Sequence, residues 1–172
     1  WMQGEFDLMT SDYALHPQYF NHMVEAFRED LKQYRSQLNN IAAAPWFCGD
    51  TTWYWKENYS HAYETIYGNY KNNALANIIF VGFQQQGERG LTNEPDEDPD
   101  DFSTGYYGSA YRTPENWTTV LRSSHFSSAA RRGIISDKFV EAILRYWCER
   151  WSGSLFMGDT LIRSQNRQQK NK

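Results

Sequence analysis

Two histidines of this 172-residue chain are each followed three residues later by a glutamate: His22 by Glu25, and His61 by Glu64. A three-residue spacing places both side chains on one face of a helix, and metal-binding helical bundles use such pairs. The order is the reverse of the usual Glu-x-x-His motif, and both pairs lie opposite the apolar stripe of their predicted helices. They are therefore predicted to face outward, and neither a metal ion nor a cofactor is predicted.

Closely spaced carboxylates occur in one acidic segment. Asp96, Asp98 and Asp100 have the alternate spacing that begins an EF-hand calcium loop. The register then fails, because Asp101 stands where the loop needs glycine and Tyr107 where it needs a bidentate glutamate. The segment is predicted to be a solvated acidic loop, whose four aspartates are also candidates for docking a basic partner.

His125 lies among serines in residues 122–128. A catalytic serine needs a strained turn, such as Gly-x-Ser-x-Gly, or a base that is fixed beside it in space. The sequence has no such motif, so a polar loop is favoured here and no catalytic residue is assigned. The alternative is an enzyme that acts on a glycan, with an acid-base pair drawn from Glu57, His61, Glu64 and His125 around an aromatic cleft.

Aromatic residues make up 17% of this otherwise polar chain. Such rings are apolar on one side and hydrogen-bonding on the other, which is typical of recognition surfaces. Trp53, Tyr54 and Trp55 are candidates for a platform that stacks on sugar rings or bases, although packing between helices is favoured. Tyr106 and Tyr107 are predicted to be exposed rings of a turn.

The net charge of −4 argues against a dedicated binder of duplex nucleic acid. Basic residues gather in the polar tail, at Arg163, Arg167, Lys170 and Lys172. Nucleic acid could bind this tail only in an assembly of many copies, because one copy contacts too few phosphates. The tail could also dock on the acidic loop of a neighbouring copy.

The first predicted helix would position His22 and Glu25. It begins at Pro17, a favoured first helical residue, and continues to a stop at residues 42–45. Its predicted apolar stripe is Phe20, Val24, Phe27, Leu31, Tyr34, Leu38 and Ile41. A helix of this kind suits a bundle or a partner helix from another subunit.

A second helix is predicted after a turn at residues 47–50, with Thr51 or Thr52 as its cap. Its predicted inner face is Tyr59, Tyr63, Ile66 and Tyr70. Residues 74–86 prolong this helix or form a strand over 77–83, which periodicity cannot separate in so short an apolar run.

A long irregular loop is predicted over residues 87–114. A last helix, capped by Ser136 or Asp137, is predicted to bury Phe139, Val140, Ile143, Leu144, Trp147 and Trp151. The predicted fold class is therefore mainly α: a helical bundle of three to four principal helices with a long irregular acidic insertion, and with minor β structure around 77–83 as the alternative. Residues 1–162 are predicted to form one domain and 163–172 a basic polar tail.

The two cysteines, Cys48 and Cys148, lack the spacing of zinc or redox sites. Two buried thiols are predicted, with one long-range disulfide as the alternative in an oxidising compartment. No apolar run approaches the roughly 20 residues of a membrane span, so a soluble protein is expected. No targeting segment is recognised, and the localisation stays open.

These features together favour a non-enzymatic structural or interaction subunit of a multi-protein assembly, such as a viral or phage particle. Its expected partners are other protein subunits, with self-association through aromatic helix faces and docking of the acidic loop on the basic tail. The glycan enzyme described above and a monomeric acidic binding module are the alternatives.

Overall fold

The computed structural model describes residues 1–34, 44–86, 92–98 and 123–150. Contacts divide the chain into two units, Trp1–Phe139 and Val140–Lys172. The first unit contains the helices α1 (Glu5–Leu8), α2 (His16–Leu31), α3 (Trp53–Asn58), α4 (Ser60–Lys71) and α5 (Ser128–Ala130), and the strands β1 (Trp46–Gly49), β2 (Ile78–Val81), β3 (Gln85–Gln86) and β4 (Thr92–Asn93). Within the described ranges, no helix is long and apolar enough to cross a lipid bilayer.

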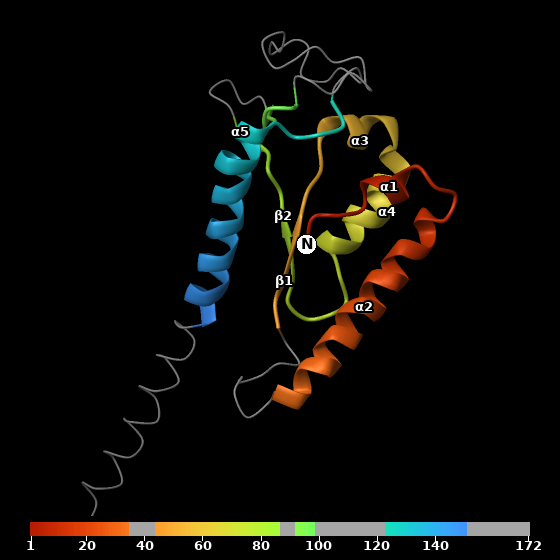
Figure 1. Cartoon of the computed structure of the whole chain (residues 1–172), viewed down its shortest axis with the longest axis vertical. Helices are drawn as coiled ribbons and strands as arrows, with labels where there is room; N and C mark the ends of the chain where they lie inside the picture. Colours follow the sequence, from red (N-terminus) through yellow and green to blue (C-terminus); the bar gives the residue numbers. More distant parts are fainter. Residues whose placement is uncertain (35–43, 87–91, 99–122, 151–172) are drawn as a thin grey trace, which may run out of the picture. The chain divides into compact units, whose positions relative to one another are not determined.

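Strands β1 and β2 form a parallel pair, in which Trp46 lies opposite Ile78 and Gly49 opposite Val81. Parallel neighbours need a long crossover connection, and α3 and α4 supply it. Figure 1 shows the two strands side by side, with α1, α2, α3 and α4 together on one side of them. The backbone of Trp1 lies along β1: its nitrogen donates to Phe47 O at 2.8 Å, and Gly49 N donates to Trp1 O at 2.8 Å.

This β-α-β arrangement contradicts the predicted helical bundle. The predicted turn at 47–50 is mostly strand β1, and the predicted helical extension over 74–86 contains strand β2. β3 and β4 add a short antiparallel pair. Four-residue apolar runs carry no usable periodicity, so a pairing between segments about 30 residues apart decides their conformation. The minor β structure considered around 77–83 is therefore present, as part of a parallel pair.

The core is formed mainly by aromatic residues of α4. Tyr63, Ile66 and Tyr70 are buried as predicted, together with Tyr67. Tyr63 stacks on Tyr67 with ring centroids 4.9 Å apart, and Phe20 of α2 contacts Tyr70 at 4.8 Å. Offset and tilted ring pairs of this kind stabilise a core beyond the area that they bury.

Helix α2 begins at His16, with Pro17 in its first turn, one residue before the predicted start. It buries Phe20 and Val24 as predicted, but its stripe then differs from the prediction. Phe27 and Tyr34 are each 49% exposed, whereas Arg28 is buried. The Arg28 guanidinium donates to two carbonyl oxygens, Ala44 O and Ala76 O, each at 2.7 Å. Because these carbonyls lie just before β1 and β2, their need for a donor turns Arg28 inward, beside the position predicted for Phe27. Leu38 and Ile41 lie outside the described residues.

The last helical segment begins earlier than predicted. Ser127 caps α5, because its Oγ accepts the Ala130 N–H at 3.0 Å. A wide turn, Arg131–Ile135, then leads into a helix over residues 136–150. The predicted cap at Ser136 or Asp137 is therefore wrong.

The predicted inward face of this helix is also mostly wrong. Phe139 is half-buried, with its ring 5.9 Å from that of Phe83. Four other members of the stripe are between 38% and 58% exposed: Val140, Ile143, Leu144 and Trp147. An apolar stripe marks a face that favours a partner, but it does not say which segment supplies that partner. Trp151 and the predicted domain boundary at 162 lie outside the described residues.

The cysteines differ in environment, which predicts a labelling experiment. Cys48 is buried in β1 and Cys148 is exposed, and no disulfide joins them. Burial raises the pKa of Cys48 to about 12, although the amino terminus of Trp1 opposes this. Because the thiolate is the reactive form, a thiol reagent at pH 8 is expected to label Cys148 rapidly and Cys48 only in urea. Rapid labelling of both thiols in the native protein would contradict the buried position of Cys48.

Candidate functional site

The N-terminal segment, the start of α3 and the segment 123–127 enclose a hollow of about 750 Å³. All three segments belong to the first unit. The lining residues are Gln3, Gly4, Glu5, Phe6, Asp7, Met9, Tyr54, Trp55, Ser124 and His125. The lining therefore combines aromatic side chains, carboxylates and one imidazole, a mixture that is typical of small-molecule sites.

Gly4 sets the path of the chain along one wall. Its φ of +133° is a conformation that side chains other than glycine rarely adopt. A Cβ at this position would also lie 3.3 Å from Ile66 Cγ2 and 3.4 Å from the Tyr67 hydroxyl. The backbone thus passes close to α4, and the next residue, Glu5, accepts a hydrogen bond from Thr51 Oγ1 at 3.1 Å.

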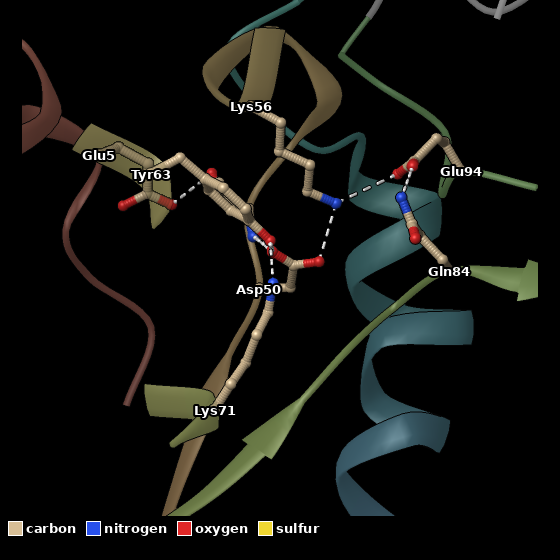
Figure 2. Close-up of polar contacts among 8 residues, drawn as sticks. Glu5, Asp50, Lys56, Tyr63, Lys71, Gln84 and Glu94 are labelled. Carbon is tan, nitrogen blue, oxygen red and sulfur yellow. Dashed lines mark hydrogen bonds and ion pairs between the residues drawn. The ribbon is translucent and has the colours of Figure 1, made fainter. Parts of the chain in front are cut away.

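A buried polar network supports this wall from the protein side, and Figure 2 shows its members. Asp50 follows β1, and its Oδ1 accepts hydrogen bonds from the Tyr63 hydroxyl at 3.0 Å and from Thr51 N at 2.8 Å. Its Oδ2 pairs with Lys56 of α3 at 2.8 Å, and Lys56 also lies 3.8 Å from the Glu94 carboxylate. Burial, with a smaller contribution from Asp50, holds the pKa of Tyr63 far above its usual range, so its hydroxyl remains a donor. The network joins β1, α3, α4 and the residues after β4.

Two further contacts extend the network toward its ends. Gln84 donates to Glu94, and Lys71 donates to the Tyr63 hydroxyl at 3.2 Å (Figure 2). The first contact joins two residues that follow β2, and the second joins two residues of α4. Because the charges are paired and hydrogen-bonded, the burial of this cluster is tolerated.

The segment that carries His125 is held from two directions. From α3, the Trp55 indole N–H donates to Ser124 O at 2.9 Å. From the acidic segment, Asp98 N donates to His125 O, and Ser127 N donates to Asp96 O, both at 2.8 Å. These backbone bonds form an antiparallel bridge between Glu97 and Phe126.

The His125 ring is oriented by its neighbour. Its Nδ1 lies 3.0 Å from Ser124 Oγ, and its backbone N–H donates to Ser123 Oγ at 3.1 Å. If Nδ1 carries the proton and donates to Ser124, Nε2 is the basic nitrogen. His125 is exposed at the hollow, so an imidazole with this tautomer can accept a proton from a bound hydroxyl group or water.

The structure brings together some of the residues that the sequence singled out. Tyr54 and Trp55 line the hollow, whereas Trp53 is half-buried and does not. Asp96 is exposed and Asp98 half-buried, and their backbones hold the His125 segment. The other candidate binding residues lie outside the described residues: Asp100, Asp101, Tyr106, Tyr107, Arg163, Arg167, Lys170 and Lys172.

Of the four residues proposed for an acid-base pair, His125 lines the hollow. Glu57, His61 and Glu64 are exposed on α3 and α4 and are not among its lining residues. Both His-x-x-Glu pairs face outward as predicted. Among the described residues, no group of three His, Cys, Asp or Glu side chains is placed to hold a metal ion.

The N-terminal wall of the hollow was not predicted from the sequence; it is formed by Gln3, Gly4, Glu5, Phe6, Asp7 and Met9. The one signal in the sequence was a glycine between two polar residues, which is consistent with an unusual backbone conformation beside a site. Nothing in the local sequence indicates that this segment faces His125, because the contact joins the two ends of the first unit.

Comparison with known proteins adds a likeness over most of the chain. No family model matches it. Over 150 residues it is 85% identical to the probable 9-O-acetyl-N-acetylneuraminic acid deacetylase of Escherichia coli (strain K12), a match that covers 87% of this chain and 46% of that protein. The crystal structure of NanS is 84% identical and superposes with a TM-score of 0.63, again over 87% of this chain and 46% of the other. The chain thus spans about half the length of each.

These findings overturn several predictions. A protein at 85% identity that is named as a probable deacetylase contradicts the non-enzymatic structural subunit, the viral or phage particle and the expected self-association with other subunits. It favours the glycan enzyme, which was the alternative prediction from the sequence. The likeness to a solved structure at 84% identity likewise agrees with the parallel β-α-β unit and not with a helical bundle.

Proposed function

We propose that this chain carries the acid-base part of an esterase site that removes an acetyl group from an acetylated sialic acid. The observation that carries the proposal is the position of His125, oriented through Nδ1 by Ser124 in a hollow lined by Tyr54 and Trp55. The 85% identity to a probable 9-O-acetyl-N-acetylneuraminic acid deacetylase supports the substrate class.

The reaction needs one proton to move twice. A water molecule is expected to approach from the Nε2 side of His125, which takes one of its protons as the water oxygen attacks the acetyl carbonyl carbon. The tetrahedral intermediate then collapses, the bond between the acetyl carbon and the sugar oxygen breaks, and the imidazolium returns the proton to that oxygen. Water is the only co-reactant overall.

The walls of the hollow suit the two parts of such a substrate. Tyr54, which is half-buried, offers aromatic surface to a sugar ring, which is apolar on its C–H faces. Trp55 is 7% exposed and presents only its edge to the hollow. Phe6, which is 74% exposed, and Met9, which is 48% exposed, offer apolar surface for the acetyl methyl group.

Acetate release and ligand binding test the proposal together. The chain is incubated with 9-O-acetyl-N-acetylneuraminic acid, and released acetate is measured; in parallel, the Trp55 indole N–H signal is followed by NMR during addition of N-acetylneuraminic acid. Acetate release with a saturable shift of that signal supports the proposal. Absence of both would overturn it, and binding without release would assign the hollow to recognition and remove the catalytic step from this chain.

The role of Ser124 gives a further prediction. Because Ser124 contributes one hydrogen bond to Nδ1, the substitution Ser124→Ala is expected to lower kcat by about tenfold or less, as the net worth of one such bond implies. A loss as large as that of a His125 variant would instead make Ser124 the nucleophile. Steady-state acetate release by the two variants decides between these roles.

A further inference from the structure

The turn that carries His125 belongs to neither a helix nor a strand, so its position depends on contacts from elsewhere in the chain. Residues 123–125 precede the bridge residue Phe126 and the cap of α5. An irregular segment of this kind would be mobile without such contacts, because fixing each backbone residue costs conformational entropy.

Glu97 makes a side-chain contact to the base of this turn. Its side chain is 1% exposed, and its Oε2 accepts the Ser123 N–H at 3.1 Å. The residues on either side act through their backbones: Asp98 N donates to His125 O, and Ser127 N donates to Asp96 O. The Glu97 carboxylate thus holds the turn two residues before His125, and the bridge holds it at His125 and beyond.

Burying a carboxylate costs free energy of desolvation, and the hydrogen bonds that it accepts have to offset this cost. A hydrogen bond from a backbone N–H to a carboxylate is stronger than one to a neutral acceptor. Without an acceptor at position 97, the buried Ser123 N–H would lose this hydrogen bond, and the turn is expected to rearrange.

We infer that Glu97 is a positioning residue for His125: its carboxylate fixes the turn at Ser123 and thereby the place of the imidazole in the hollow. The inference rests on the proposed esterase function for its catalytic consequence, but the positional claim stands on the hydrogen bonds alone. It assigns to the first half of the acidic segment a part in the site.

Three variants test the inference by steady-state acetate release. Glu97→Ala removes the acceptor and is expected to lower kcat by about 10- to 100-fold, since small displacements of a catalytic group have effects of this size, while KM changes little. Glu97→Gln keeps an acceptor oxygen of the same reach and is expected to restore most of kcat. Glu25→Ala is the matched control, because it makes the same side-chain change at an exposed position of α2 that does not line the hollow, and it is expected to keep wild-type kcat and KM.

A purely structural role predicts a different pattern. If Glu97→Ala lowers the melting temperature but leaves kcat of the folded protein unchanged, or if Glu97→Gln is as defective as Glu97→Ala, the inference is wrong. Should Glu97→Ala fail to fold, Glu97→Asp replaces it, because the side chain that is one methylene shorter no longer reaches Ser123 N.

A measurement without substrate separates this inference from the proposed function. Hydrogen exchange of the Ser123 amide and of the Trp55 indole N–H, which donates to Ser124 O, reports the order of the turn directly. Both protons are expected to exchange faster in Glu97→Ala and at the wild-type rate in Glu97→Gln. If the wild-type chain releases no acetate, the esterase proposal fails while this exchange experiment still tests the positioning role; unchanged exchange in Glu97→Ala overturns the latter.

Discussion

Replacing His125 by glutamine is expected to lower the rate of acetate release by about 10²- to 10⁴-fold, the usual contribution of a general acid-base group. Glutamine has nearly the size of histidine and keeps hydrogen-bonding atoms, but it cannot take up and return a proton near neutral pH. The ring is exposed at the hollow, so the substitution is expected to leave the fold and its melting temperature nearly unchanged.

The chain contains a matched control for this variant. His61 is also exposed, but it lies on the outer face of α4 and is not among the lining residues of the hollow. His61→Gln is therefore expected to retain wild-type kcat and KM. Equal activity of the two variants and the wild-type chain would show that neither His125 nor His61 is the base.

The sequence could identify His125 as one of four candidates for acid-base chemistry, but not as the strongest of them. Among the four residues proposed for acid-base chemistry, it was distinguished only by neighbouring serines, which are common in loops. Its support comes from Trp55, 69 residues before the Ser124 carbonyl that it contacts, and from Glu97, 26 residues before Ser123. Contacts across such separations follow from the tertiary fold, and local motifs do not encode them.

The buried face of α4 was largely predicted from the spacing of its residues. Tyr63, Ile66 and Tyr70 are buried as this spacing indicates. Tyr59 is only half-buried, and Tyr67 is buried although it was not predicted. On α2 the prediction failed at Phe27, which is exposed, while the neighbouring Arg28 is buried and donates to two carbonyl oxygens. It also failed at β1 and β2, since a parallel pair depends on a partner strand that comes after the crossover connection.

The acidic segment illustrates a different limit. Its carboxylates were treated as one charged surface, either solvated or docked on a partner. In the described residues Asp96 is exposed, but Glu97 is buried and Glu94 takes part in the polar network with Lys56. Charge density along a sequence does not show which carboxylates turn inward, because that depends on donors supplied by other segments.

The largest expected loss of stability follows from removing Lys56. Its side chain is 9% exposed, and its ammonium lies between the carboxylate of Asp50, whose side chain is 4% exposed, and that of Glu94. In Lys56→Met the apolar stem is kept, but among the described residues Asp50 retains only the neutral donors Tyr63 and Thr51, both on one oxygen. Breaking a buried ion pair in this way costs about 3–5 kcal/mol, which urea unfolding monitored by circular dichroism measures.

A second lysine provides the control that distinguishes the loss of a buried charge from the loss of any lysine. Lys71 donates to the same Tyr63 hydroxyl but is exposed, so Lys71→Met is expected to cost about 1 kcal/mol or less. The double replacement of Asp50→Asn with Lys56→Met should then recover part of the stability, because the Asp50 carboxylate that lost its ion-pair partner is also replaced by a neutral group. If Lys56→Met costs no more free energy of unfolding than Lys71→Met, the charges of the network shown in Figure 2 are not buried. The wall formed by Glu5 and Thr51 must then be supported by the apolar core of α4 alone.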